Sequence, residues 1–198
     1  MARARIYTKS GDDGTTGLLF GGRVRKDSEL PTAYGSVDEA QSILGLARAH
    51  GPSEGPLREL VISLQRDLWV LMAELATQPS NRHKLVPGTS AVTPEMVERL
   101  ERTIDELGEL YDPPTEFVVP GETVTAAWLD LARTVVRRAE RHALVAAEPP
   151  SLVGPYLNRL SDLLWTMARW QEGDSRPARS VTPVARAGPS NEPEEDRP

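Results

Sequence analysis

The hydrophobic residues of this chain recur every three or four positions over five long segments, which is the spacing that one face of an α-helix produces. Residues 56–77 are the clearest case, because their leucine and valine side chains form a single apolar stripe. The helices predicted from this pattern span residues 33–49, 56–77, 93–111, 123–147 and 152–171.

Residues that start and stop helices lie at the boundaries of these segments. Gly51-Pro52 and Pro149-Pro150 end the helices before them, and Thr93-Pro94-Glu95 combines a capping threonine, a first-turn proline and a first-turn acid. Because the connections are short, the pattern predicts an all-α fold, a five-helix up-and-down bundle. Residues 3–26 are rich in glycine and threonine and are expected to form an irregular segment before it, which could include a short strand.

The last residues of the chain differ in kind from the helical part. Residues 172–198 contain five prolines and no aromatic residue, leucine or isoleucine. Such a segment buries too little apolar surface to offset the entropy lost on ordering, so a disordered tail is expected. The predicted division is therefore a helical domain over residues 1–171 and a tail over 172–198. Composition leaves open a tail that binds a partner.

Composition and charge narrow the function classes. The chain has 198 residues, a net charge of −6 and no cysteine. An acidic chain is not typical of a general nucleic-acid or membrane-surface binder, so an anion site would need a local basic cluster. The chain lacks an apolar signal-peptide core and an apolar run long enough to span a membrane, so a cytoplasmic protein is expected. The three histidines show no metal-ligand spacing, and no metal site is predicted.

The first candidate for chemistry is the stretch YTKSGDDGTTG, residues 7–17. Its glycines let the backbone approach a ligand closely, and its hydroxyl and lysine side chains are donors suited to phosphate oxygens. The stretch does not have the spacing of a Walker A loop. Composition alone is equally consistent with a flexible, turn-rich segment.

The second candidate is a cluster of arginines in the helix predicted over residues 123–147. At about 100° per residue, Arg133, Arg137, Glu140 and Arg141 fall within one arc of about 100°, and Arg138 lies near its border. A solvated helix face is the common explanation for such a run. Arginine rather than lysine favours planar, multidentate binding of a polyphosphate.

Three further features are less specific. Asn158, Asp162, Trp165 and Arg169 share one face of the last helix, which by itself favours a polar seam between helices. Asp38, near the start of the first helix, is either a partner for a buried arginine or a surface acid near a helix N-terminus.

Phe117, in the stretch EFVVPG, is either a core anchor or an aromatic placed against a flat cofactor. No serine-hydrolase elbow or zinc-protease motif is present, so an enzyme of this sequence would take its chemistry from a cofactor or from the substrate.

In this order, the stretches YTKSGDDGTTG, RVRKD, AYGSVDE, FVVPG, ARTVVRRAER and YLNRLSD resemble the PduO-type ATP:cob(I)alamin adenosyltransferases over about residues 3–171. The resemblance implies a homotrimer with active sites at subunit interfaces. It implies transfer of the 5′-deoxyadenosyl group from MgATP to cob(I)alamin. The partners that it implies are a corrinoid or flavin reductase and an adenosylcobalamin-dependent enzyme such as methylmalonyl-CoA mutase.

The resemblance also implies roles for individual residues. Asp38 and Arg133 would form a salt bridge at the subunit contact near the corrinoid, and Phe117 would keep the lower ligand off the cobalt. Arg137 would act on the triphosphate during catalysis. The residues implied for ATP binding are Thr8, Lys9, Ser10, Gly11, Thr16, Gly17, Lys26, Arg137, Arg138, Glu140, Arg141 and Asn158.

The chain departs from the family pattern at several places, of which Glu122 matters most. It stands where a second glycine is expected after Gly121, close to Phe117. Residues 30–32, residues 72–74 and Trp165 are also atypical. Two other function classes stay open from the residues: a non-catalytic ATP- or corrinoid-binding module, and a plain helical scaffold whose arginine face is solvated.

Overall fold

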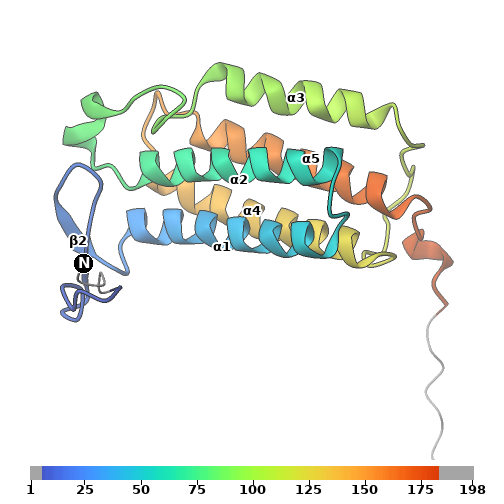
Figure 1. The fold of residues 1–198 in the computed structure, drawn as a ribbon, viewed down its shortest axis with the longest axis horizontal. Helices are drawn as coiled ribbons and strands as arrows, with labels where there is room; N and C mark the ends of the chain where they lie inside the picture. The colour runs from blue at the N-terminus through green and yellow to red at the C-terminus, as the bar shows by residue number, and fades with distance from the viewer. Residues whose placement is uncertain (1–5, 183–198) are drawn as a thin grey trace, which may run out of the picture.

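The computed structural model describes residues 6–182 and consists mainly of five long helices (Figure 1). Successive helices run in alternating directions, so the predicted up-and-down arrangement of helices is confirmed. The elements are β1 (Thr15–Gly17), β2 (Arg23–Arg25), α1 (Glu29–His50), α2 (Pro56–Leu75), η1 (Pro79–Lys84), α3 (Pro94–Gly108), α4 (Val124–Ala146), α5 (Val153–Glu172) and η2 (Ala178–Ser180).

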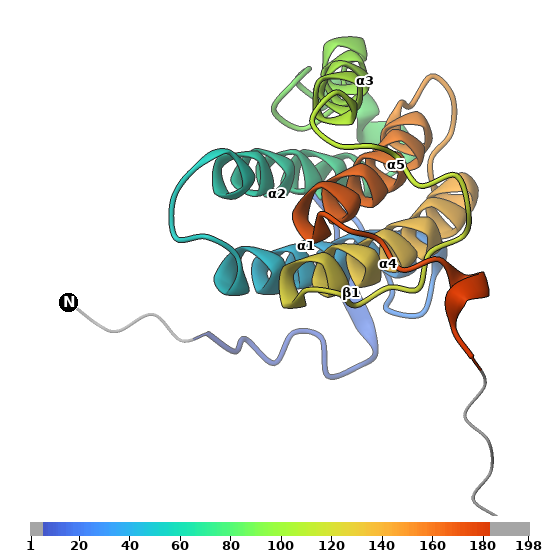
Figure 2. The same cartoon turned by 90° about the vertical axis from the view of Figure 1, so that its right-hand side faces the viewer.

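Four helices form the body of the bundle and the fifth lies on one side of it. α1 packs against α2 and α4, α4 packs against α5, and α3 packs on α5. The end-on view shows α3 farthest from α1 (Figure 2). Within residues 6–182, no helix has the length and hydropathy needed to cross a membrane.

Small residues line the contact between α1 and α4. Alanines at seven-residue intervals in both helices, Ala33, Ala40 and Ala47 in α1 and Ala132 and Ala139 in α4, are almost completely buried. Two helix turns separate these positions, so they share one face of each helix. A face of alanines lets two helices approach closely, because the ridges that must interdigitate are shallow. The opposite face of α4 is left free to carry large polar side chains.

A two-stranded hairpin closes one end of the bundle. β1 and β2 pair antiparallel, and the turn between them has positive φ angles at Phe20, Gly21 and Gly22. The amide of Leu19 donates to the carbonyl of Ala76 at the end of α2 (2.8 Å). The hairpin therefore holds the preceding loop, residues 8–14, at this end of the molecule (Figure 1).

The structure differs from the sequence-based expectation at several boundaries. α1 begins at Glu29 rather than near Ala33, because Pro31 is accommodated in the first helical turn, where its missing N–H costs no hydrogen bond. The irregular N-terminal segment contains the short hairpin, and the loop predicted over residues 78–92 contains the 3₁₀-helix η1.

The expected disorder of the tail is wrong for residues 173–182. This segment forms an antiparallel bridge between Pro177 and Val118 and a 3₁₀-helix, η2. It needs no apolar core of its own, since the loop before α4 supplies hydrogen-bond partners for its backbone. The rest of the predicted tail, residues 183–198, lies outside the described residues.

A buried polar contact ties α2, α3 and α5 together. The hydroxyl of Tyr156 donates to the carboxylate of Asp67 (2.8 Å), which also pairs with Arg99. Tyr156 is fully buried. Burial raises the pKa of Tyr156 well above its ordinary range, and the neighbouring Asp67 charge raises it further.

Replacing this tyrosine tests the contact. We expect Tyr156→Phe to lower the free energy of unfolding by about 1–3 kcal/mol, because Asp67 stays buried with one donor fewer. The folded parent retains the Tyr156 proton where the unfolded chain releases it, so this group's stabilising contribution is full below about pH 10 and declines above it.

Urea titrations of Tyr156→Phe and of the parent at about pH 8 and about pH 11 measure both effects. The variant should lose less stability than the parent between the two pH values. Tyr7→Phe, at an exposed tyrosine, is the matched control. Equal stability of parent and Tyr156→Phe at both pH values would contradict this account.

Candidate functional site

Helix α4 carries the arginine cluster and presents it away from the bundle core. Thr123 caps the helix by accepting a hydrogen bond from the amide of Ala126 (3.1 Å). Ala132, Val136 and Ala139 are buried, whereas Arg137 and Arg141 are exposed. The predicted division of this helix into a packed face and an arginine face is confirmed.

Arg137 and Arg141 provide positive charge that no acid among residues 6–182 neutralises. Arg141 Nη1 donates to the backbone carbonyl of Arg137 one turn earlier (2.9 Å). Among residues 6–182, no carboxylate lies within ion-pair distance of either guanidinium. Two neighbouring arginines in this state can bind a multiply charged anion with little competition from the protein's own acids.

Glu140 and Asn158 lie together beside this pair. Asn158 Nδ2 donates to Glu140 Oε1 (3.0 Å), and Arg159 Nη1 donates to Asn158 Oδ1 (2.8 Å). Arg138 is placed differently, because its guanidinium pairs with Glu39 of α1. The structure thus brings together Arg137, Glu140, Arg141 and Asn158, while Arg138 contacts α1.

Arg133 is oriented by a buried network of charges between α4 and α5. Its Nε lies 3.2 Å from Asp130 Oδ1, and Arg169 Nη2 donates to the other Asp130 oxygen (2.5 Å). Arg169 also donates to Glu172 Oε2 (3.1 Å), and its side chain is only 1% exposed. Charges this deeply buried are stable only when they are paired.

Of the face that the sequence interpreted as a polar seam, Arg169 belongs to this network, whereas Asp162 on the same face is exposed. The sequence patterns did not identify Asp130 and Glu172 as members of this network. A usable signal was present, since Asp130 precedes Arg133 by three positions and Arg169 precedes Glu172 by three positions.

A cavity of about 330 Å³ lies over this network. Phe117 stands at it with 82% of its surface exposed, so the core-anchor interpretation of this residue is wrong. Arg133 and Phe117, both predicted to lie near one ligand, line the same cavity. The full lining is Glu116, Phe117, Val118, Pro120, Asp130, Arg133, Trp165 and Arg169.

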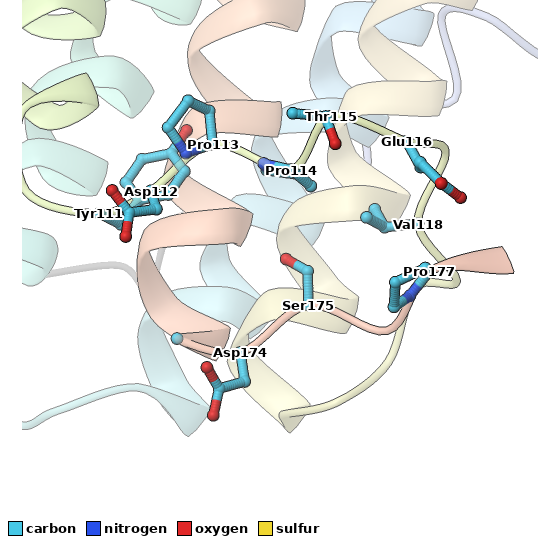
Figure 3. Close-up of a pocket in the computed structure, with 11 residues that line it drawn as sticks. Tyr111, Asp112, Pro113, Pro114, Thr115, Glu116, Val118, Asp174, Ser175 and Pro177 are labelled. Carbon is cyan, nitrogen blue, oxygen red and sulfur yellow. The ribbon is translucent and has the colours of Figure 1, made fainter. Parts of the chain in front are cut away.

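A second cavity, of about 580 Å³, adjoins the first. Figure 3 shows it between residues 111–118 on one side and Asp174, Ser175 and Pro177 on the other. Glu116 and Val118 line both cavities. The segment after α5 therefore builds part of the wall around the Phe117 loop.

The N-terminal loop is organised by its own polar side chains. Asp13 accepts hydrogen bonds from the amide (2.9 Å) and the hydroxyl (2.7 Å) of Thr15, which lower the pKa of the Asp13 carboxyl. The hydroxyls of Thr8 and Ser10 are 2.7 Å apart. A Cβ at Gly11 would lie 3.1 Å from the amine of Lys26, so the absence of a side chain there lets Lys26 reach the loop.

Within residues 6–182, no hydrogen bond or ion pair joins this loop to the α4 arginines or to Asn158. Asp38 is exposed on α1, whereas Arg133 pairs with Asp130. One chain therefore presents a loop rich in phosphate-type donors and, separately, a helix face of arginines. Both are features of a helical bundle that suit the binding of an anion.

Comparisons with known proteins place this bundle in a family. The cobalamin adenosyltransferase family model matches residues 6–171. A corrinoid adenosyltransferase of Citrobacter freundii is 39% identical over 171 residues, which cover 85% of this chain and 95% of the relative. One from Mycobacterium bovis is 38% identical over 188 residues, with 88% and 96% covered.

Solved structures agree with the sequence relatives. A variant PduO-type ATP:corrinoid adenosyltransferase from Lactobacillus reuteri, complexed with cobalamin and ATP, matches with a TM-score of 0.78 and 29% identity. That match covers 89% of this chain and 97% of the solved chain. The chain belongs to the cobalamin adenosyltransferase family.

The buried network predicts that replacing Asp130 lowers the stability of the fold more than replacing Glu39 does. Asp130→Ala should lower the free energy of unfolding by about 3–5 kcal/mol, because it leaves buried Arg169 and the neighbouring Arg133 without this partner. Glu39→Ala, which breaks the exposed pair with Arg138, should cost less than about 1 kcal/mol. Denaturant titration of both variants measures the difference. Equal costs would show that the Asp130 contacts add nothing beyond a surface pair.

Proposed function

We propose that this protein transfers the 5′-deoxyadenosyl group of ATP to cob(I)alamin and releases triphosphate. The observation that carries the proposal is the pair of exposed arginines on α4, Arg137 and Arg141, beside Glu140 and Asn158. Membership of the cobalamin adenosyltransferase family and the complex of a relative with cobalamin and ATP support it.

The chemistry suits a site without a protein nucleophile. The electron pair of Co(I) attacks C5′ of ATP, a Co–C bond forms, and the C5′–O bond breaks with its electrons passing to the triphosphate. No proton has to be moved in this step, so no general base is needed. The protein's task is to hold the reactants in line and to stabilise the charge on the departing triphosphate.

We assign that task to two sets of residues. The donors of the N-terminal loop, Thr8 to Gly11 with Thr16, Gly17 and Lys26, would hold the phosphates, as glycine-rich loops do. On α4 and α5, Arg137, Arg141, Glu140 and Asn158 would hold the leaving triphosphate, and Arg138 would join them only by leaving Glu39. Glu140 is a hard oxygen donor of the kind that suits the hydration shell of Mg²⁺, which would neutralise phosphate charge.

A homotrimer would bring these two sets together. They make no polar contact within residues 6–182 of one chain, so we propose that the loop of one subunit meets the arginine face of its neighbour. Apolar side chains left exposed on α1 and α4, Leu46, Leu131, Leu144 and Val145, suit burial in such a contact. Asp38 of one subunit would then pair with Arg133 of the next.

Sedimentation of the purified protein tests the trimer. We expect the mass of three chains, and a mass of one or two chains would contradict the trimer.

The cavity beside Phe117 is the proposed corrinoid side. An exposed phenyl ring at a cavity floored by arginines can cover the lower face of the corrin and exclude the lower ligand from cobalt. Four-coordinate cob(II)alamin is easier to reduce, so a corrinoid or flavin reductase can then supply the electron. An adenosylcobalamin-dependent enzyme such as methylmalonyl-CoA mutase would receive the product in the cytoplasm.

Arg137 and Arg138 are adjacent arginines that the structure distinguishes. Arg137→Ala should lower turnover about 10²- to 10³-fold, because it removes a contact to the leaving group. Arg138→Ala should have a much smaller effect, since the Arg138 guanidinium is held by Glu39. The readout is the anaerobic rate with cob(I)alamin and MgATP, with circular dichroism to verify the fold. Equal rates for Arg137→Ala and the parent would refute the phosphate role.

Phe117 can be tested without turnover. Phe117→Ala should bind ATP as the parent does, because neither Arg137 nor Arg141 lines the cavity at which the phenyl ring stands. It should fail to produce four-coordinate cob(II)alamin, because nothing then covers the lower face. The visible spectrum of cob(II)alamin with protein and MgATP reports this species directly. Parental amounts of it in the variant would remove Phe117 from the mechanism.

A further inference from the structure

The segment after α5 crosses to the loop that carries Phe117, and we name residues 173–178 the strap. In Figure 2 it runs from the end of α5 alongside the loop that precedes α4. Figure 3 shows Pro177 of the strap next to Val118 of the loop. Two parts of the chain more than fifty residues apart in sequence are thus joined at the cavity.

The start of the strap is anchored to the buried charge network. The hydroxyl of Ser175 donates to Glu172 Oε1 (2.6 Å), and Glu172 is paired with the buried Arg169. The position where the strap leaves α5 is therefore fixed by the same network that orients Arg133.

The far end of the strap is anchored to the Phe117 loop. The amide of Val119 donates to the carbonyl of Arg176 (2.9 Å), and the amide of Ala178 donates to the carbonyl of Phe117 itself (2.8 Å). Arg176 Nε donates to Glu122 Oε1 (2.6 Å), which adds an ion pair at the other end of the loop. Glu122 is the position at which this chain departs from the expected glycine.

The loop depends on these contacts for its conformation. Within residues 6–182, the backbone–backbone hydrogen bonds made by residues 112–122 are the two to Arg176 and Ala178. The loop contains no helix or strand, and Gly121 has a φ of +116°, which leaves the chain free to bend there. Phe117 makes little contact of its own, being 82% exposed.

We propose that the strap holds Phe117 in place at the cavity, with Arg176 and Glu122 as its positioning residues. The ion pair between Arg176 and Glu122 adds to the two backbone hydrogen bonds. The loop is therefore already ordered when the Phe117 ring meets the lower face of the corrin, and binding does not have to order it. The inference rests on the proposed function for the role of Phe117. The contacts between the strap and the loop are structural and do not depend on that function.

The test compares Arg176→Ala with Arg102→Ala, a matched control at an exposed arginine of α3 whose ion pair is with Glu98 of the same helix. Arg176→Ala should raise the hydrogen-exchange rates of the Val119 and Ala178 amides about two- to fivefold, the effect expected from losing a partly exposed ion pair. The proportion of four-coordinate to five-coordinate cob(II)alamin, with protein and MgATP, should fall by a similar factor. The double variant Glu122→Arg/Arg176→Glu should recover both.

Turnover separates positioning from a general loss of structure. With cob(II)alamin and a reductant, Arg176→Ala should be slower than the parent. With pre-reduced cob(I)alamin, which has no lower ligand to remove, its rate and its KM for ATP should be parental. A chain ending at Glu172 lacks the whole strap and should show the same selective defect more strongly.

The outcomes are distinct. Unchanged amide exchange in Arg176→Ala overturns the strap's hold on the loop. Faster exchange with an unchanged four-coordinate fraction overturns its role in positioning Phe117. A parent protein that consumes no cob(I)alamin contradicts the proposed function instead, and amide exchange then decides the structural statement alone.

Discussion

The buried guanidinium of Arg169 is the constraint on which the functional end of this molecule depends. A charge on a side chain that is only 1% exposed must be paired with an opposite charge, and Asp130 of α4 and Glu172 of α5 provide it. Because Asp130 also pairs with Arg133, the same requirement orients an arginine that lines the cavity beside Phe117. Because Glu172 also accepts from Ser175, it fixes where the segment after α5 begins its path to the Phe117 loop.

Helix α4 connects this network to the rest of the proposed site. Its alanine face packs closely against α1, which leaves the opposite face free for polar side chains. Along that face, Arg133 lies at the cavity where the corrinoid is proposed to bind, while Arg137 and Arg141 lie one and two turns farther on, where the triphosphate is proposed to bind. In the proposed arrangement, one helix sets the spacing between the two reactants, which is what an in-line displacement requires of its protein.

Much of this could be predicted from sequence, because it depends on local periodicity. The five helices follow from apolar spacing, and the arc shared by Arg137, Glu140 and Arg141 follows from helix geometry. The rest depends on contacts between distant residues. Neither the pairing of Arg138 with Glu39 nor the bridge that orders residues 173–182 has a local signal, and the exposure of Phe117 contradicts the usual burial of a phenylalanine. The i, i+3 spacing could indicate that Asp130 pairs with Arg133 and Glu172 with Arg169, but it could not indicate that these pairs are buried.

The most direct test of adenosyl transfer is anaerobic. Chemically reduced cob(I)alamin, MgATP and the purified protein are mixed, and the cob(I)alamin absorbance is followed with time. The account predicts a decay that requires both protein and ATP, with adenosylcobalamin and triphosphate formed in equal amounts. Absence of decay while ATP still binds would contradict it and would favour a binding module without catalysis.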